Sequence, residues 1–208
     1  MPNEIEVKFL LRDFDKSVIA SKEDLERLNV NSIDELFKKV VSIGNFIEQY
    51  YLAFDKVPEI LKLYNDSLDP NIYTIGRIRK EVSKKNIEYV LCFKSSGDYV
   101  MGEEEFQIIS STFEDYKKIC MSNISKYRLK EPVGKYKAEV DVFQKNKSEF
   151  LNNLILTEVE VKTIEEIPLV PKFGLDVSKV KNYKNFGLSL MNNKWYLVFF
   201  TNYPGFFH

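Results

Sequence analysis

Charged and apolar residues alternate strictly near the start of the chain, and the same pattern returns several times further along. In the run Glu4-Ile5-Glu6-Val7-Lys8-Phe9, every second position carries a charge. Because successive side chains of a β-strand point to opposite faces, this period predicts strands with one charged and one apolar face. The further segments with this pattern are Arg77–Arg79, Val90–Lys94, Glu103–Ile108, Lys126–Arg128, Glu139–Phe143 and Glu158–Lys162. Together with the segment 47–54, they predict about eight strands.

The charges are also sorted by sign within single strands. Arg77 and Arg79 share one face of a predicted strand, and Glu158 and Glu160 share a face of another. Like charges at neighbouring positions of a sheet repel, so this sorting brings no advantage to an ordinary solvated face. It is explained if carboxylate pairs converge on a metal ion and basic pairs converge on phosphate oxygens. The alternative is a sheet whose charged face is simply exposed to water over an apolar core.

Eight strands are enough to close a barrel that holds side chains or one small ligand. A dry interior lined with charges would be unstable, because unpaired buried charge is costly. We therefore predict an α+β fold with a closed eight-stranded antiparallel β-barrel. Its charged interior would contain water, metal and a polyanion, and its apolar residues would face outward under packed helices.

Helix starts are predicted at Ser21, Ser32 and Ser111, each of which is followed three residues later by an acidic residue. The helix that begins at Ser111 is expected to place four side chains inward: Phe113, Tyr116, Ile119 and Cys120. Shorter helices are expected over residues 58–64 and 148–154. No linker or repeat interrupts the chain, so we predict a single domain over residues 1–208, with an aromatic extension at about 191–208.

Composition narrows the chemistry. The 208 residues include 30 basic and 31 acidic residues, and the net charge of −1 argues against a binder of nucleic acid or of anionic membranes. The one histidine is the terminal His208, and Cys92 and Cys120 have no neighbour at metal-ligand spacing. These counts argue against a zinc site and against a Ser–His–Asp triad. A metal would then be a hard cation held by carboxylates: magnesium, manganese or calcium.

The two ends of the chain suggest a cytoplasmic protein. The first nine residues carry charges at Glu4, Glu6 and Lys8, and no apolar signal-peptide region follows them. The apolar stretch at 195–200 is too short to span a bilayer. The aromatic extension is expected to pack on the barrel exterior or to form a homodimer contact.

The ordered motifs resemble those of the CYTH, or triphosphate tunnel metalloenzyme, superfamily. The matching features are Glu4-x-Glu6-x-Lys8, Gln49-x-Tyr51, Arg77-x-Arg79, Lys94, Glu103-x-Glu105, Lys126-x-Arg128, Glu139-x-Asp141-x-Phe143, Glu158-x-Glu160 and Asn182-Tyr183-Lys184-Asn185. The resemblance extends from Glu4 to Leu190. It implies an eight-stranded antiparallel tunnel that binds a triphosphate along its axis.

The resemblance also implies roles for the residues at matching positions. Phosphate oxygens would be contacted by Lys8, Arg77, Arg79, Lys94, Lys126, Arg128 and Lys184. Mg²⁺ or Mn²⁺ would be held by Glu4, Glu6, Glu139, Asp141, Glu158 and Glu160, with Glu105 as further acidic wall. The catalytic residues would be Glu4, Glu6 and Lys8.

Two segments depart from the family pattern. Residues 55–75 resemble an insertion, which would cover one mouth of the tunnel. The run Phe173–Ser178 lacks the family lysine, for which Lys179, Lys181 or Lys184 would substitute.

Three functions follow from this reading. The first is metal-dependent hydrolysis of inorganic tripolyphosphate or of a nucleoside or thiamine triphosphate. The second is an adenylate cyclase of the same superfamily, in which the ribose 3′-hydroxyl attacks the α-phosphate and a base pocket is required. The third is a non-catalytic module that binds a polyphosphate or a nucleotide. The expected partner is a small-molecule triphosphate, with no nucleic acid and no membrane.

Overall fold

The computed structural model describes residues 3–95 and 100–192 and confirms an α+β fold with antiparallel strands. The strands are β1 (Asn3–Arg12), β2 (Asn45–Leu52), β3 (Ile75–Val82), β4 (Ile87–Lys94), β5 (Val100–Gln107), β6 (Cys120–Val133), β7 (Tyr136–Phe143), β8 (Ile155–Val161) and β9 (Leu175–Asp176). The α-helices are α1 (Lys22–Arg27), α2 (Ile33–Ile43), α3 (Val57–Tyr64), α4 (Ser110–Lys117) and α5 (Asn185–Asn192). Four 3₁₀ turns join them: η1 (Phe54–Lys56), η2 (Leu151–Asn153), η3 (Ile164–Leu169) and η4 (Lys181–Tyr183).

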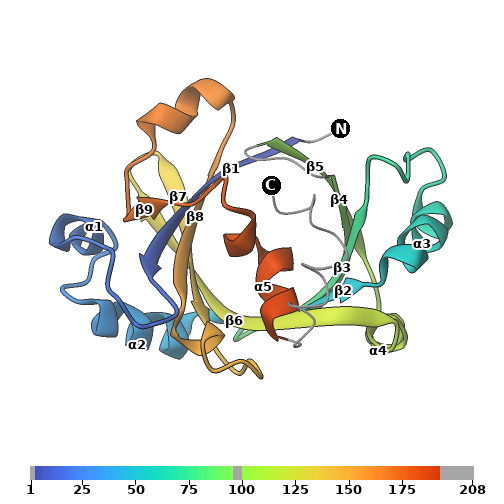
Figure 1. Ribbon diagram of the computed structural model, residues 1–208, viewed down its shortest axis with the longest axis horizontal. Coiled ribbons are helices and arrows are strands. Elements are labelled where there is room, and N and C mark those ends of the chain that lie inside the picture. Colours follow the sequence, from blue (N-terminus) through green and yellow to red (C-terminus); the bar gives the residue numbers. More distant parts are fainter. Residues whose placement is uncertain (1–2, 96–99, 193–208) are drawn as a thin grey trace.

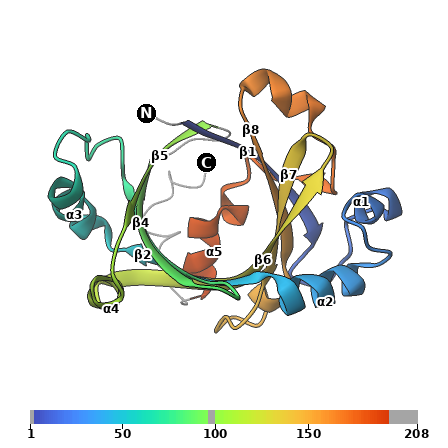
Figure 2. The same cartoon turned by 180° about the vertical axis from the view of Figure 1, so that it is seen from behind.

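The strands form one sheet in the order β5-β4-β3-β2-β6-β7-β8-β1-β9. β1 also pairs with β5, through Asn3–Gly102, Glu4–Met101 and Ile5–Val100. The sheet curves so strongly that its strands surround α5 (Figures 1 and 2). The described residues contain one strand more than the sequence predicts. This strand is β9, whose two residues pair with Phe9 and Leu10 of β1.

The apolar face of the sheet lies on the outside of this curve, as predicted. On one side, Val7, Val140 and Val159 form a buried cluster with Leu25 of α1 and Leu36 of α2. These contacts place α1 and α2 against the outer face of β1, β7 and β8 (Figure 1). Burial of their apolar side chains stabilises both the helices and the curved sheet.

A second outer cluster lies on the opposite side of the sheet. Leu61 of α3 and Phe113 of α4 pack there with Ile78, Leu91 and Phe93 of β3 and β4. The segment 55–75 therefore covers the outer face of the sheet. The prediction that it closes one mouth is wrong, because the apolar stripe of α3 is buried against the strands.

The predicted capping residues explain where α1 and α2 begin. The third predicted start, Ser111, is wrong, because it lies inside α4, whose N-cap is Ile109 without a side-chain hydrogen bond. Ser21 and Asp24 form the predicted capping box of α1, in which each side chain accepts a hydrogen bond from the backbone of the other. Ser32 caps α2 by accepting a hydrogen bond from the backbone N–H of Glu35.

Two further helix predictions need correction. α4 ends at Lys117, and Cys120 begins β6, because the chain there pairs with Leu52 of β2. The helix predicted over 148–154 is reduced to the single 3₁₀ turn η2. The aromatic extension from residue 193 onward lies outside the described residues.

The inner face of the sheet is apolar at one end. Leu10, Ile124, Phe143 and Leu156 pack there with Leu188 of α5. α5 is held by polar contacts as well: the Oγ atoms of Ser122 and Ser189 are 2.8 Å apart, and Asn192 Nδ2 donates to the carbonyl oxygen of Asn123 at 2.9 Å. This end of the sheet interior is therefore filled by side chains of α5.

Candidate functional site

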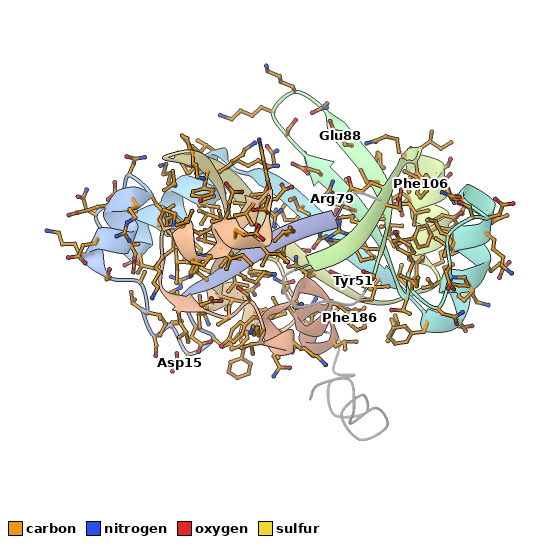
Figure 3. All side chains as sticks on the ribbon, turned by 90° about the horizontal axis from the view of Figure 1, so that it is seen from above. Asp15, Tyr51, Arg79, Glu88, Phe106 and Phe186 are labelled. Carbon is orange, nitrogen blue, oxygen red and sulfur yellow. The ribbon has the colours of Figure 1, made fainter. Side chains whose placement is uncertain are left out.

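The predicted basic and acidic residues lie on the inner face of the curved sheet, because they alternate with residues that pack in the outer clusters. Several of them are buried to an unusual degree for charged side chains. Lys126 and Asp141 are 0% exposed, Lys8 is 3% exposed and Arg77 is 5% exposed. Charged residues are rarely buried so fully unless they are paired. Figure 3 shows Arg79, Tyr51 and Phe186 at successive levels of the curved sheet, with Phe186 at the α5 end.

One group of charges lies on β6, β7, β8 and β1. Nε and Nη2 of Arg128 each lie 2.6 Å from an oxygen of Asp141, and the guanidinium also contacts Glu139 and Glu158. Lys126 Nζ lies 2.5 Å from Asp141 Oδ2, and Lys8 Nζ lies 2.6 Å from Glu158 Oε1. We call the six residues Lys8, Lys126, Arg128, Glu139, Asp141 and Glu158 the β6–β1 charge cluster.

The electrostatics of this cluster shift several pKa values. Burial alone would raise the pKa of Glu158, but the cations Lys8, Arg128 and Lys126 hold it well below its usual range. Burial would lower the pKa of Lys8, but Glu158 and Glu6 raise it above its ordinary value. Lys126 behaves differently, because burial and the neighbouring Arg128 lower its pKa to about 8 despite the contact with Asp141.

A second group of charges lies on β3, β4 and β5. Nη2 of Arg77 lies 3.1 Å from Glu103 Oε1 and 3.4 Å from Glu105 Oε1. Arg79 Nη2 lies 3.4 Å from Glu105 Oε1, and Lys94 Nζ lies 2.9 Å from Glu103 Oε2. We call Arg77, Arg79, Lys94, Glu103 and Glu105 the β3–β5 charge cluster.

The two arginines of this cluster have donors that remain unused. Nε of Arg77 and Nε of Arg79 are buried, and neither has a hydrogen-bond partner among the described residues. The side-chain oxygen of Gln49, which is opposite Arg79 across β2 and β3, is also buried without a partner there. A buried N–H group without an acceptor is destabilising, so the two arginine donors point to an anionic ligand on this part of the inner face.

Tyr51 connects the charged and the apolar parts of the interior. It is opposite Arg77 across β2 and β3, and its ring packs edge-on against Phe186 of α5 with centroids 5.3 Å apart. Burial raises the pKa of its hydroxyl to about 12. α5 also reaches the β6–β1 charge cluster, since Lys126 Nζ donates to Asn185 Oδ1 at 3.2 Å.

The carboxylates predicted to bind metal divide into two sets. Glu139, Asp141 and Glu158 are engaged by basic side chains, as described above. Glu6 and Glu160 are directly opposite each other on β1 and β8, where Glu160 is exposed and Glu6 Oε1 is 3.7 Å from Lys8 Nζ. Opposed like charges repel across strands, and a divalent cation between them would remove that repulsion. The donor set of Glu6 and Glu160 thus fits Mg²⁺ or Mn²⁺.

A different group satisfies a purely geometric test for metal ligands. Within the described residues, ligand atoms of Cys92, Glu103 and Glu105 all lie within 4.8 Å of one another. Arg77 and Lys94 already contact these carboxylates, so a further cation would meet two positive charges there.

Most predicted phosphate-contacting residues are thus brought to the inner face, in the two charge clusters. Lys184 directly precedes α5 and is half-buried. Glu4 lies in β1, but its side chain is outside the described part of the structure.

Sequence reasoning assigned no role to two inner-face residues, Cys92 and Asn185. Cys92 could have been found, because it stands two positions before Lys94 on the same strand and must share its face. Asn185 ends the motif over residues 182–185, but the motif does not predict its contact with Lys126, which depends on where α5 packs.

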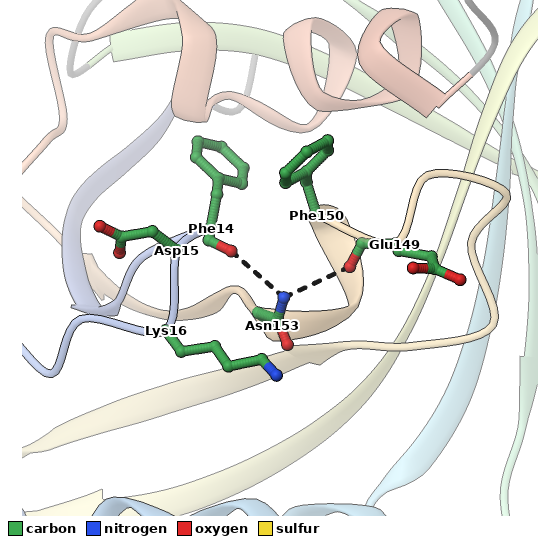
Figure 4. A pocket seen from close by; sticks show the side chains of 6 residues that line it. All are labelled: Phe14, Asp15, Lys16, Glu149, Phe150 and Asn153. Carbon is green, nitrogen blue, oxygen red and sulfur yellow. Dashed lines mark hydrogen bonds between the residues drawn. The ribbon is translucent and has the colours of Figure 1, made fainter.

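An open surface pocket of about 370 Å³ lies elsewhere, where the loop after β1 meets η2 (Figure 4). Its lining residues are Phe14, Asp15, Lys16, Glu149, Phe150 and Asn153. Asn153 Nδ2 donates there to the backbone oxygens of Phe14 and Glu149. None of these residues belongs to either charge cluster. The single lysine, Lys16, lies among the lining residues with two carboxylates, Asp15 and Glu149, a composition that does not favour phosphate binding.

Comparison with known proteins gives matches at the level of structure. No family model and no curated protein matches the chain. Among solved structures, the inorganic triphosphatase NE1496 is similar with 24% identity and a TM-score of 0.49, over 91% of this chain and 96% of that chain. The protein PH1819 from Pyrococcus horikoshii has 19% identity and a TM-score of 0.44, over 80% and 82% of the two chains.

A candidate adenylate cyclase from Bacillus halodurans has 12% identity and a TM-score of 0.44, over 93% of this chain and 92% of that chain. Among the helices of the described residues, none is both long enough and apolar enough to cross a membrane.

Proposed function

We propose that this chain hydrolyses a triphosphate with the help of a divalent metal ion, inside a closed eight-stranded tunnel formed by β1 to β8. The pairing of β1 with β5 supports closure of that tunnel. Because α5 and the apolar cluster around Leu156 fill one end, the substrate would enter from the opposite end.

The unused Nε–H donors of Arg77 and Arg79 are the observation that carries this proposal. A triphosphate offers oxygens that accept from both groups, and arginine is well suited to paired contacts with phosphate. An ordinary solvated face would leave these donors to water, whereas here both atoms are buried within the ring.

The two charge clusters support the proposal through their composition. Each contains basic side chains that now contact carboxylates, and a triphosphate would compete for the same basic groups. Lys8, Lys126 and Arg128 would bind phosphate oxygens from one side of the ring, and Arg77, Arg79 and Lys94 from the other. Binding from both sides would hold the phosphate chain in one orientation and neutralise its charge.

Glu6 and Glu160 are the residues that would hold Mg²⁺ or Mn²⁺, together with Glu4, which comes two positions before Glu6 in the sequence of β1. A bound divalent cation would supply charge neutralisation at the phosphoryl group. In the reaction itself, water oxygen bonds to the terminal phosphorus and the bridging P–O bond breaks. Tripolyphosphate would then yield orthophosphate and pyrophosphate, and a nucleoside triphosphate would yield orthophosphate and the diphosphate.

The test is to incubate the purified protein with tripolyphosphate or ATP, each with Mg²⁺, Mn²⁺ or EDTA. Orthophosphate, pyrophosphate and cyclic AMP are measured in every reaction. We expect metal-dependent orthophosphate release that falls at least tenfold in Glu160→Gln. The matched control is Glu165→Gln, which changes an exposed glutamate on η3 and should leave activity unchanged.

Each other outcome has a defined meaning. Cyclic AMP and pyrophosphate from ATP would assign the cyclase reaction instead. Binding of tripolyphosphate without turnover would assign a non-catalytic module. Equal activity in EDTA would contradict the role of the divalent cation.

A further inference from the structure

We infer that Cys92 is a positioning residue, whose thiol keeps Glu103 from accepting hydrogen bonds from both Nε and Nη2 of Arg77 and so leaves Nε for the phosphate. The inference rests on the proposed function for its role in binding, and it concerns a residue with no part in the scheme above.

Cys92 stands in the middle of the β3–β5 charge cluster. It is opposite Arg77 on β3 and opposite Glu105 on β5, so the three residues form one row across neighbouring strands. Its side chain is 0% exposed, and its Sγ lies 2.9 Å from Glu103 Oε1, to which it donates. Burial raises the pKa of the thiol to about 12, so the S–H donor persists through the neutral range.

Both carboxylate oxygens of Glu103 are contacted by donor groups. Oε1 accepts from Cys92 at 2.9 Å and from Nη2 of Arg77 at 3.1 Å, and Oε2 lies 2.9 Å from Lys94 Nζ. The thiol and Lys94 therefore hold the carboxylate from two sides. In this position Glu103 reaches Nη2 of Arg77, while Nε of Arg77 is left without a partner among the described residues.

A carboxylate that is free to turn prefers the paired geometry, in which its two oxygens accept from Nε and from one Nη of the same guanidinium. Such a pair would occupy the donor of Arg77 that we assign to the substrate. The buried, unpartnered Nε is thus a second observation, independent of the cysteine, that points to an anionic ligand beside Cys92. The thiol keeps the carboxylate out of the paired geometry, and Arg77 stays ready to bind phosphate.

The first experiment compares Cys92→Ala with Cys92→Ser and with the wild-type protein. Loss of the S–H donor in Cys92→Ala should raise KM for tripolyphosphate and its Kd about tenfold, with a much smaller change in kcat. A serine hydroxyl restores a donor at the same place, so Cys92→Ser should return Kd to within about twofold of the wild type.

The matched control is Cys120→Ala. Cys120 lies at the start of β6 against the outer cluster, and its Sγ contacts the backbone oxygen of Tyr116 at 3.3 Å. This variant should leave KM and Kd unchanged. Urea midpoints of all three variants show whether each one folds.

A second measurement separates positioning from a merely structural role. In a Glu103→Gln background, Cys92→Ala should have no further effect on Kd, because the carboxylate that it restrains is gone. Additive effects of the two substitutions would overturn the inference.

A third measurement needs no substrate. Hydrogen exchange of the Arg77 Nε–H, followed by NMR in the ligand-free protein, should slow in Cys92→Ala when Glu103 takes that proton into a hydrogen bond. Unchanged exchange would overturn the Cys92 inference even if the protein is an active triphosphatase. Slower exchange in a protein that neither binds nor hydrolyses tripolyphosphate would uphold the restraint on Glu103 and overturn the proposed function.

Discussion

Replacing Asp141 with asparagine removes one negative charge from the most deeply buried part of the β6–β1 charge cluster. Asp141 is 0% exposed and contacts Lys126 Nζ at 2.5 Å and two nitrogens of Arg128 at 2.6 Å. Asparagine keeps the shape of the side chain, so the substitution changes charge and leaves packing largely intact. Lys126, which is also 0% exposed, would then lie buried without its closest counter-ion.

The expected loss follows from the cost of an uncompensated buried charge. Breaking a buried ion pair by removing one partner destabilises a protein by about 3–5 kcal/mol. With a urea dependence of about 2 kcal/mol per molar, the unfolding midpoint should fall by roughly 2 M. Equilibrium urea unfolding, followed by far-UV circular dichroism at neutral pH, measures this midpoint directly.

The control is the same substitution at an exposed aspartate. Asp115 Oδ1 lies 2.7 Å from Lys118 Nζ, a separation close to that of the buried pair, but both side chains are at least 70% exposed. Asp115→Asn should leave the midpoint within experimental error, because exposed ion pairs contribute little. If both variants unfold at the same urea concentration, the argument that Asp141 compensates buried charge is refuted.

Two further predictions concern pH and backbone geometry. The pKa of Glu158 is held well below its ordinary value of 4.5, so its contribution to stability is complete above that pH and is lost as pH falls through the depressed value. Glu158→Gln should therefore be less stable than the wild type at pH 7, and its urea midpoint should fall less than that of the wild type as the pH is lowered. Urea midpoints of the two proteins that fall in parallel with pH would contradict this. Gly174 has φ +143°, and a Cβ there would meet the Leu10 carbonyl oxygen at 2.3 Å, whereas at Gly134 (φ +60°) nothing lies within 4 Å. Gly134→Ala should lower the free energy of unfolding by about 1–2 kcal/mol, the cost of a left-handed backbone for alanine. Gly174→Ala should lower Tm by more, because its Cβ would also clash with the backbone. Equal Tm values of the two variants in thermal unfolding would contradict this.

The period-two pattern is enough to predict where β1 to β8 lie and which of their faces is charged, but not the two-residue strand β9. Val7 and Lys8, for example, pack in the outer cluster and in the inner charge cluster, as their alternation requires. The sorting of charges by sign within single strands was also informative. Like charges repel on an ordinary solvated face, so such sorting indicates a face that contacts a ligand or oppositely charged strands. The partners of each charge were beyond the sequence, because they depend on register: Glu158 meets Lys8 through the pairing of β8 with β1.

α5 shows why a buried element escapes pattern analysis. Amphipathic helices are found by an apolar stripe with a period of 3.6 residues, which requires one face toward water. Gly187, Leu188, Ser189, Leu190 and Asn192 of α5 are all buried, because the helix lies inside the curved sheet. Polar and apolar residues follow each other without a stripe, and each polar one is satisfied by a strand or loop nearby, as Ser189 is by Ser122.

The ion pairs of the inner face make a divalent cation favourable for triphosphate binding. In the two charge clusters, the carboxylates occupy the basic groups that a triphosphate would need. A triphosphate that displaced Glu158 from Lys8 and Arg128 would leave that carboxylate buried and unpaired, which is costly. Positive charge supplied together with the substrate offsets this cost as well as the charge of the phosphates.

Triphosphate binding should therefore depend on divalent cations more steeply than phosphate neutralisation alone requires. Glu158→Gln, which removes the displaced charge, should weaken that dependence in binding titrations, and an unchanged dependence would show that the displaced carboxylates do not set it.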